Sequence, residues 1–444
     1  MPYTPHTAED VREMLATIGV ESIDDLFREI PEGLKVNGQL NIPTRMDEAR
    51  LYQHLGDLAR QNVNLAKTTC FLGAGIYDRY IPASVGAIIS RGEFLTAYTP
   101  YQPELSQGYL QTIYEFQSMI AELYGMDIAN ASMYDGATAM AEAAILAHGV
   151  KGRNRIAVSK AVHPHSLQVL ETYSWSVDLA VDEIPIQDGQ TSDYSSVGED
   201  TACVIVQYPN FFGIIEDLKA AREAADRAGA LLIVVADPTA CALLVPPGEF
   251  GADIVVGEGQ PLGIAMGYGG PLLGLFACKQ EHVRRIPGRI VGRTTDGKDR
   301  IGYTMTLRTR EQDIRREKAT SNICTNEALM ALASTVYMEA LGKNGMQSVA
   351  ESTVRNTQYA IKQLVGAGAR LKFTGKVFGE FVLDLGQSAV EVRDSLLKEN
   401  ILAGLPLGDL YPGMENCLLV AVTETRTKEQ IDHFAACLSK ILSS

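Results

Sequence analysis

The sequence has no basic excess, no long apolar run and no ordered spacing of its cysteines. Its formal net charge is −15, which argues against a nucleic-acid partner because phosphate binding requires an excess of basic residues. No apolar run reaches the roughly 20 residues that a membrane helix needs. The seven cysteines show no CxxC spacing, and the N-terminus lacks the basic region and apolar core of a secretory signal. These absences predict a soluble, cytoplasmic protein that binds neither nucleic acid nor a membrane.

Lysine is missing from a stretch whose layout indicates a cofactor site. In Ala236–Pro271, ADPTACALLVPPGEFGADIVVGEGQPLGIAMGYGGP, Asp237 ends an apolar strand, but no lysine occurs between Lys219 and Lys279. In pyridoxal-phosphate (PLP) enzymes of the aspartate aminotransferase type, such an aspartate faces the pyridine nitrogen and a later lysine carries the aldehyde. Without the lysine, Asp237 indicates either such a site or an ordinary polar residue at the end of a strand.

The chain divides into three regions by its periodicity. Residues 1–65 read as a polar helical segment, residues 66–325 as a large α/β domain, and residues 326–444 as a smaller α+β C-terminal domain. Short β-branched runs alternate with helices in the large domain, which predicts a doubly wound, mostly parallel sheet with ligands at the carboxyl ends of its strands. The predicted strands are residues 155–159, 202–210, 230–237 and 253–259.

Five segments outside these strands carry candidate chemistry, and each also has a structural interpretation. The helix N-terminus in Ser132–Gly149 is an anion site or an ordinary capped helix, and the glycines of Gly263–Pro271 form a phosphate cradle or a tight crossing. The aromatic, proline-rich Ala97–Gly108 is a binding loop or a turn. The arginines of Thr306–Ala328 lie near an anionic group or on a solvated face. The histidines of His163–His165 are too isolated for a metal site, and we predict no bound metal.

Four long segments together give the chain a specific resemblance. They are TAYTPYQPELSQGYLQ, SMYDGATAMAEA, GEGQPLGIAMGYGGP and TREQDIRREKATSNICTNEA. They closely resemble the P-protein of the glycine cleavage system, the PLP-dependent glycine dehydrogenase (decarboxylating), and the resemblance runs essentially end to end. In that family one long chain with two homologous halves is replaced in some organisms by two subunits. This chain looks like the N-terminal half, the α subunit or subunit 1, which implies an aspartate aminotransferase-like large domain of PLP fold type I.

The resemblance also explains the missing lysine. Counted back from Gly270 and Pro271, Gln260 falls where the catalytic half of the family has its Schiff-base lysine. An amide nitrogen cannot form that bond, so the chain is expected to bind no PLP covalently, and the partner β subunit (subunit 2) is expected to carry the PLP. The implied assembly is α2β2. The implied reaction decarboxylates glycine and transfers the aminomethyl group to the lipoyl arm of the H-protein.

The fold type further implies which loops of this chain reach the partner's active site. The turn after the lysine strand and a Thr-Ser pair further along contact the neighbour's cofactor phosphate, which corresponds here to Gly269, Gly270, Thr320 and Ser321. Candidates for lining the glycine or lipoyl channel are Tyr98, Tyr101 and Gln102.

Three other interpretations of the sequence stay open. The chain is alternatively a structural or docking subunit that contributes no residue to the active site, which the glutamine at position 260 permits. It is alternatively an independent binding protein on an aminotransferase scaffold. A self-sufficient PLP enzyme would need Lys279, which follows GLFAC on a different strand from the one that ends at Gly259.

Overall fold

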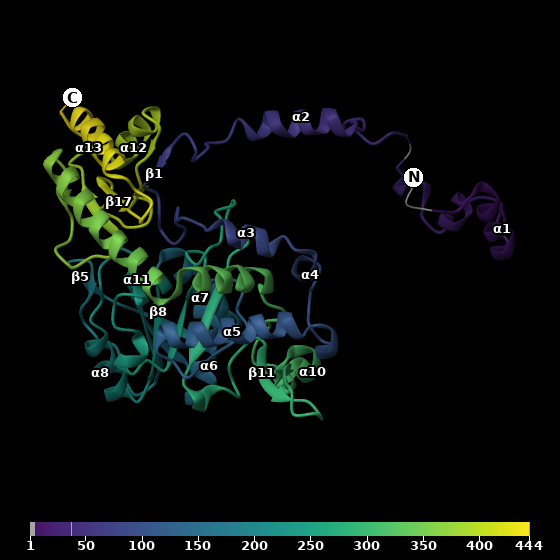
Figure 1. Ribbon diagram of the computed structural model, residues 1–444, viewed down its shortest axis with the longest axis horizontal. Helices are drawn as coiled ribbons and strands as arrows, with labels where there is room; N and C mark the ends of the chain where they lie inside the picture. The colour runs from purple at the N-terminus through teal and green to yellow at the C-terminus, as the bar shows by residue number, and fades with distance from the viewer. Residues whose placement is uncertain (1–4, 37, 444) are drawn as a thin grey trace. The chain divides into compact units, whose positions relative to one another are not determined.

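The computed structural model describes residues 5–36 and 38–443, and the chain forms two units, Met1–Asn64 and Leu65–Ser444 (Figure 1). The first unit contains helices α1 (Ala8–Ile18) and α2 (Glu48–Ala59), neither of which has a buried residue. Thr7 caps α1 by accepting a hydrogen bond from the backbone N–H of Asp10.

A seven-stranded mixed sheet is the framework of the second unit. Four of its seven strands are the β-branched, nearly continuous apolar runs predicted at residues 155–159, 202–210, 230–237 and 253–259, because strands buried on both faces need no polar alternation. In spatial order the strands are β2 (Ile128–Ala129), β10 (Gly274–Cys278), β9 (Ile254–Glu258), β8 (Leu231–Ala236), β7 (Thr201–Tyr208), β3 (Arg155–Ser159) and β4 (Ala180–Ile184). The five strands from β9 to β4 run parallel, whereas β10 is antiparallel to both of its neighbours.

Helices cover both faces of this sheet because its central strands are apolar on both sides. In β8, Leu232 and Val234 pack into one core, and Leu231 and Ile233 pack into a second. The first core takes the apolar faces of α5 (Gln107–Tyr124), α8 (Leu218–Ala228) and the first half of α11 (Ala328–Gly366). The second core takes those of α6 (Gly136–Lys151) and α7 (Pro164–Ser176). This three-layer arrangement places the carboxyl ends of the parallel strands at one edge.

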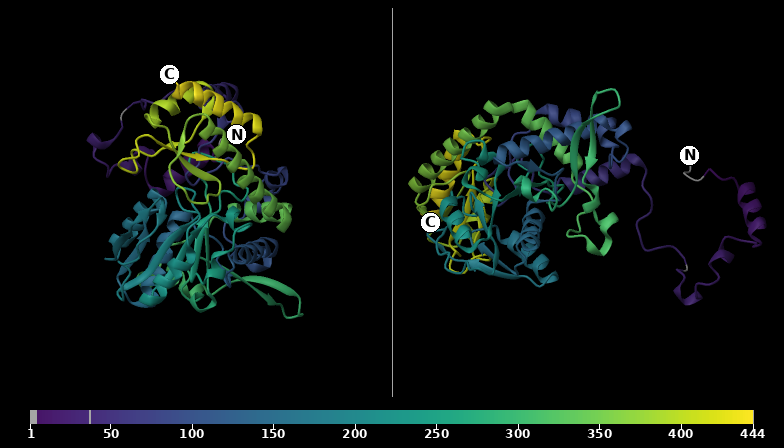
Figure 2. Two further views of the ribbon diagram at one scale, coloured as in Figure 1. Left: turned by 90° about the vertical axis from the view of Figure 1, so that its left-hand side faces the viewer. Right: turned by 90° about the horizontal axis from the view of Figure 1, so that it is seen from below.

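A smaller α+β region follows along the second half of α11, which bends at Gly342 and runs toward the C-terminal elements (Figure 2). Its sheet has the order β13 (Arg370–Leu371), β14 (Glu380–Asp384), β17 (Cys417–Ala421) and β16 (Leu405–Pro406). Helices α12 (Ala389–Lys398) and α13 (Lys428–Leu442) pack on it. A capping box of Thr427 and Gln430 begins α13.

The start of the second unit joins this C-terminal region. Strand β1 (Thr69–Cys70) pairs in parallel with β15 (Ile401–Leu402), and Phe71 packs in the C-terminal core. The sequence had assigned residues 69–71 to the large domain. The division at residues 66–325 and 326–444 stays a proposal. The segment after β1 runs from the C-terminal core, which contains Phe71, to the first core of the large sheet, which contains Val85.

The remaining elements surround the large sheet. They are α3 (Ala83–Ile89), α4 (Gly92–Leu95), α9 (Pro238–Cys241), α10 (Gln312–Arg315), the hairpin of β11 (Ile290–Thr295) with β12 (Ile301–Thr306), and the hairpin of β5 (Ile186–Gln187) with β6 (Gln190–Thr191). Among the helices of the described residues, none combines the length and the apolar character that crossing a membrane requires.

Candidate functional site

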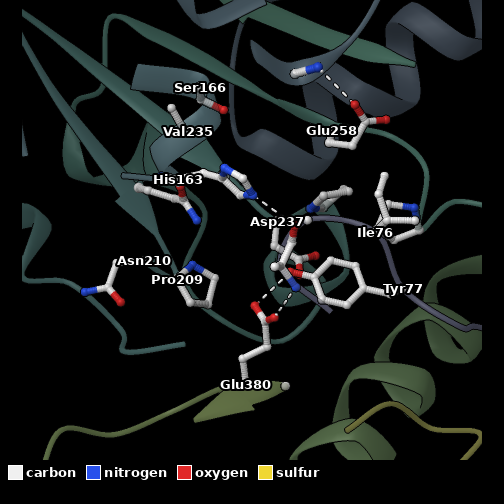
Figure 3. A pocket seen from close by; sticks show the side chains of 18 of the residues that line it. Ile76, Tyr77, His163, Ser166, Pro209, Asn210, Val235, Asp237, Glu258 and Glu380 are labelled. Carbon is white, nitrogen blue, oxygen red and sulfur yellow. Dashed lines mark hydrogen bonds between the residues drawn. The ribbon is translucent and has the colours of Figure 1, made fainter. Parts of the chain in front are cut away.

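A cavity of about 280 Å3 lies at the carboxyl ends of β7, β8 and β9 (Figure 3). This is the edge of the sheet where the doubly wound pattern predicts a ligand site. The first residues of α6 and α7, the segment 74–79 and the start of β14 complete its wall. The cavity is therefore bounded both by elements around the seven-stranded sheet and by the C-terminal region.

Asp237 lines this cavity directly after β8, as its position in the sequence suggests. Its Oδ1 caps the short helix α9 by accepting the N–H groups of Thr239 at 2.7 Å and Ala240 at 3.2 Å. Its other oxygen, Oδ2, accepts no hydrogen bond from the residues that the structure describes. Asp237 therefore keeps one oxygen for a ligand, while the hydrogen bonds from backbone N–H groups to the other oxygen fix the side chain.

His163 forms another part of the wall and is held in one neutral tautomer. Its Nε2 lies 2.9 Å from the carbonyl oxygen of Ala74, which can only accept, so Nε2 carries the proton. Its Nδ1 accepts the N–H of His165 at 3.1 Å. Burial lowers the pKa of His163, which agrees with an uncharged imidazole. The ring thus presents a flat, neutral surface to the cavity, a role that the sequence did not indicate.

Gln260 lies just behind the cavity wall and is 2% exposed. Its Oε1 accepts the N–H of Tyr77 at 2.9 Å, while its Nε2 donates to the carbonyl oxygens of Tyr77 at 3.1 Å and Ile264 at 2.8 Å. Both ends of the amide are therefore used by the backbone. The side chain fixes the segment that carries Tyr77 and presents no free nucleophile to the cavity.

Glu258, two residues earlier, connects the end of β9 to the start of α6. Its Oε2 accepts the N–H of Gly136 at 3.0 Å, and its Oε1 accepts those of Gln260 at 2.9 Å and Leu273 at 3.0 Å. Burial raises the pKa of Glu258 to about 7, although the three N–H groups oppose that rise. The carboxyl group is thus held from three directions inside the cavity wall.

Glu380 brings the C-terminal region to the same cavity. Its Oε1 accepts the N–H of Ala74 at 2.7 Å, and its Oε2 accepts the hydroxyl of Tyr77 at 2.8 Å. Burial raises the pKa of Glu380 to about 7 as well. Neither Glu258 nor Glu380 was a candidate from the sequence. A glutamate directly after or within an apolar strand is the signal that would have pointed to them.

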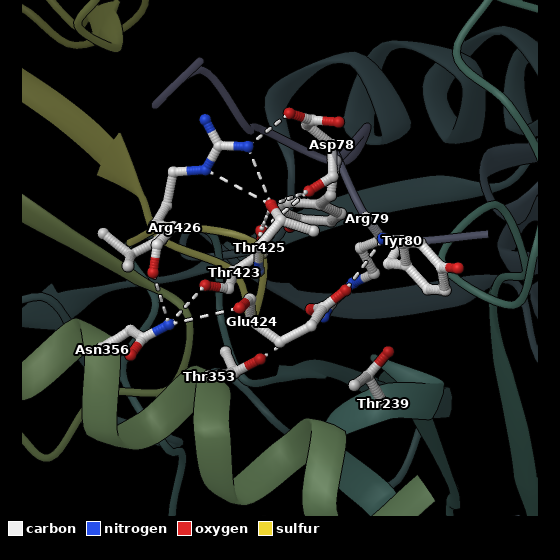
Figure 4. A network of polar contacts seen from close by, with 12 residues as sticks. Asp78, Arg79, Tyr80, Thr239, Thr353, Asn356, Thr423, Glu424, Thr425 and Arg426 are labelled. Carbon is white, nitrogen blue, oxygen red and sulfur yellow. Dashed lines mark hydrogen bonds and ion pairs between the residues drawn. The ribbon is translucent and has the colours of Figure 1, made fainter. Parts of the chain in front are cut away.

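A network of ion pairs clamps the next residues of the same segment to the C-terminal region (Figure 4). The guanidinium of Arg79 pairs with Glu424 at 2.6 Å, and that of Arg426 pairs with Asp78 at 2.6 Å. Thr423 donates to the backbone oxygen of Asp78 at 2.7 Å. The cavity wall formed by residues 74–79 is therefore fixed from both sides.

The predicted channel residues lie outside this cavity, in the loop between α4 and α5. The side chains of Tyr98 and Tyr101 are 78% and 48% exposed, and Gln102 is exposed. The centre of the Tyr101 ring lies 5.5 Å from the guanidinium of Arg289 and 5.0 Å from that of Arg308. Tyr101 is therefore held in place although its ring is half exposed.

Arg289 is a buried cation that sequence reasoning missed. It donates to the hydroxyl of Tyr101 at 3.1 Å, the carbonyl of Cys324 at 2.9 Å and the hydroxyl of Thr325 at 3.1 Å. No carboxylate among the described residues pairs with it. Its signal in the sequence is an arginine set between a proline-glycine turn and the apolar start of β11, in IPGRIVG. Arg289 joins two loops that the sequence had marked separately.

The predicted phosphate-contact residues fall into two groups. Thr320 is exposed and Ser321 is half-buried, and both precede the residues that Arg289 holds. Gly269, at φ +85°, and Gly270 lie in the largely exposed turn between β9 and β10. The structure brings the 320–325 segment next to the Tyr101 loop, but none of these four phosphate-contact candidates lines the cavity.

Lys279, the alternative cofactor lysine, lies away from this site. Its ammonium group forms an ion pair with Asp253, which also pairs with Arg222 at 2.8 Å. Lys279 follows β10, which runs antiparallel to β9, so its backbone emerges at the opposite edge of the sheet from the cavity. It is therefore a structural partner of Asp253.

Comparisons with known proteins agree with this architecture. A family model described as glycine cleavage system P-protein matches residues 1–438. A probable glycine dehydrogenase (decarboxylating) subunit 1 from Geobacillus sp. (strain WCH70) is 51% identical over 435 residues, which cover 97% of each chain. A crystal structure of glycine decarboxylase (P-protein) of the glycine cleavage system, in inhibitor-bound form, has a TM-score of 0.92 at 43% identity and covers 99% of this chain and 100% of that chain. An alanine–glyoxylate aminotransferase from Nostoc sp. has a TM-score of 0.59 at 16% identity and covers 85% of this chain and 95% of its own, a likeness of fold alone.

Proposed function

This chain belongs to the glycine cleavage system P-protein family, and we propose that it is the subunit of that enzyme that does not carry the cofactor. A partner β subunit (subunit 2) supplies the PLP and the lysine that binds it. Together, as a cytoplasmic α2β2 assembly, the subunits decarboxylate glycine and transfer its aminomethyl group to the lipoyl arm of the H-protein. Neither subunit is active alone.

The observation that carries this proposal is the state of Gln260. Its amide nitrogen cannot form a Schiff base, because its lone pair is delocalised into the carbonyl group. Both of its polar ends are also used, by the backbone of Tyr77 and Ile264. The position therefore offers neither the chemistry nor the freedom of a cofactor lysine.

The rest of the cavity does not fit PLP either. Asp237 has an oxygen that could face a pyridinium nitrogen, and His163 offers a flat surface beside it. However, no lysine lines the cavity, and Glu258 lies at the α6 terminus, where a phosphate group would find its N–H donors. We therefore route no step of the reaction through this cavity.

The loops around Tyr101 are the part of this chain that we assign to the partner's active site. Tyr101 is half exposed yet fixed by two arginines, which is the combination that a positioning side chain needs. Tyr98 and Gln102 flank it and line the glycine or lipoyl channel with it. Thr320 and Ser321 lie in the segment that leads to Cys324, which Arg289 holds, and with Gly269 and Gly270 they contact the partner's cofactor phosphate.

Reconstitution tests the proposal. The full chain is treated with PLP and borohydride, alone and with the β subunit, and the mass of each chain is measured beside the release of CO2 from glycine with lipoylated H-protein. We expect a covalent adduct on the β subunit alone and turnover when both are present. A specific adduct on a lysine of this chain would overturn the proposal.

A purely structural or docking role is separated by a second measurement on the same assembly. If this chain contributes no residue to the site, Tyr101→Ala and Thr320→Ala leave turnover unchanged while the α2β2 assembly stays intact. If its loops reach the site as proposed, turnover falls although the assembly still forms. The size of the assembly, measured by light scattering, distinguishes loss of chemistry from loss of association.

A further inference from the structure

We propose that Glu258 is an internal substitute for a phosphate group. Its carboxylate occupies the N-terminus of α6 and excludes anionic ligands from the cavity of this chain, independently of the glutamine at position 260. The inference rests on the proposed function, in which this chain leaves the cofactor to its partner. It adds that two separate residues, Glu258 and Gln260, keep PLP out.

The first step of the argument is the count of free N–H groups at this terminus. The first four N–H groups of a helix have no partner within the helix and form an anion site. In α6 the N–H of Asp135 donates to the hydroxyl of Thr138 at 3.3 Å, and that of Thr138 donates to the carboxylate of Asp135 at 2.8 Å. Glu258 takes the N–H of Gly136 at 3.0 Å. Of the four N–H groups from Asp135 to Thr138, only that of Ala137 has no acceptor among the described residues.

The second step is that hydrogen bonds and close packing hold Glu258 in one position. Three N–H groups from different parts of the chain hold its carboxylate. The backbone of α6 also lies close to it, since a Cβ placed on Gly136 would come within 2.9 Å of the backbone nitrogen of Glu258. Glycine at position 136 permits this approach. The carboxylate is thus a fixed part of the wall and not a side chain that a ligand could displace.

The third step is electrostatic. A phosphate group at the α6 terminus would meet the carboxyl groups of both Glu258 and Asp135, whose oxygens repel those of the phosphate. Asp237 and His163, which also line the cavity, accept N–H groups of α9 and α7 instead. The cavity therefore discriminates against the phosphate of a ligand more than against its ring.

The first experiment needs no covalent chemistry. The full chain, Glu258→Ser and the control Glu380→Gln are unfolded thermally in inorganic phosphate and in chloride at equal ionic strength. Glu380→Gln removes a second carboxyl group of the same cavity that makes no contact with α6. We expect phosphate to stabilise Glu258→Ser alone, because removing the carboxylate frees the N–H of Gly136. An equal phosphate response in all three proteins would overturn the inference.

The second experiment compares Gln260→Lys with Gln260→Lys/Glu258→Ser. Each protein is treated with pyridoxal or with PLP and then borohydride, and peptide masses locate the adduct. We expect Gln260→Lys to prefer pyridoxal at position 260, and the double variant to shift the ratio toward PLP by tenfold or more. If Gln260→Lys alone takes PLP in preference to pyridoxal, the inference is wrong, and this holds even if the double variant does not fold. If position 260 reacts with neither ligand, the phosphate response decides.

Failure of the proposed function gives a different result. It appears as a specific PLP adduct on the unmodified chain, at a lysine other than position 260. That outcome leaves the phosphate comparison of Glu258→Ser unaffected. The two claims are therefore tested separately.

Discussion

Arg289 donates a hydrogen bond to the hydroxyl of Tyr101 at 3.1 Å while its guanidinium lies 5.5 Å from the centre of the same ring. The contact joins the loop before α5 to the start of the β11–β12 hairpin. Through Cys324 and Thr325 it reaches the segment before α11 as well. One buried cation thus sets the positions of three segments that are distant in the sequence, and we expect its loss to affect all of them.

Arg289→Lys is predicted to lower the free energy of unfolding by about 2 kcal/mol, because lysine keeps the charge but cannot make the forked contacts to Tyr101, Cys324 and Thr325. The assembled enzyme should also lose turnover, since the Tyr101 loop is no longer fixed. Chemical unfolding and CO2 release measure the two effects. Arg316→Lys, at an exposed arginine, is the matched control. Equal stability and turnover in the two variants would contradict the assignment.

Tyr101→Ala is predicted to reduce turnover of the assembled enzyme about tenfold or more, because misplacing a positioning group by about 1 Å already has such an effect. The fold is expected to stay intact, since Tyr101 is 48% exposed and Arg289 keeps its hydrogen bonds to Cys324 and Thr325. Leu105→Ala removes an 81% exposed side chain from the same loop and is expected to have little effect. Parallel losses in both variants would indicate a general disturbance of the loop and not a role for the Tyr101 ring.

Local patterns in the sequence predict the local structure well. The β-branched runs correctly give strands β3, β7, β8 and β9, because burial on both faces leaves a continuous apolar signature. The capping residues Thr7 and Thr427 mark the starts of α1 and α13, because each satisfies N–H groups within three residues. Asp237 at the end of β8 correctly points to the cavity. Each of these features depends on neighbours along the chain.

Features that depend on distant partners were not predictable in the same way. Glu380 reaches the cavity from the C-terminal region, and Thr69 pairs with Ile401 across most of the chain. Arg289 acquires its hydrogen-bond partners only when two distant loops fold against it. In a single sequence, an isolated charged residue in an apolar run signals that a partner exists but not which one.

Gly213→Ala is predicted to lower the free energy of unfolding by at least about 3 kcal/mol, because the new side chain overlaps backbone that cannot move cheaply. A Cβ at this position would lie 1.9 Å from the carbonyl oxygen of Glu380, and Gly213 has φ +80°. Urea unfolding measures the change. Gly86→Ala, on the open side of α3 with nothing within 4 Å, is the control and should be neutral or slightly stabilising. Comparable stability of the two variants would mean that the C-terminal region does not pack on Gly213 as described.

The pH dependence of stability tests the burial of Glu380. Its pKa is raised from 4.5 to about 7, so the folded protein binds a proton more tightly than the unfolded chain does. The stabilisation from this proton is fully present below about pH 4.5 and is lost as the pH rises through about 7. Glu380→Gln keeps the shape but cannot ionise. We therefore expect the variant to gain stability relative to the parent between about pH 5 and about pH 8, by up to about 3 kcal/mol.

Urea unfolding of both proteins across this range gives the difference directly. Glu258 has a raised pKa too, but it is present in both proteins, so its contribution cancels. Asp384→Asn, at a half-buried residue on the same strand that pairs with Arg370 at 3.0 Å, is the control. It should show no gain toward high pH, because removing it breaks an ion pair and relieves no buried charge. A constant difference between Glu380→Gln and the parent would mean that Glu380 reaches water, and that the cavity is more open than its contacts to Ala74 and Tyr77 indicate.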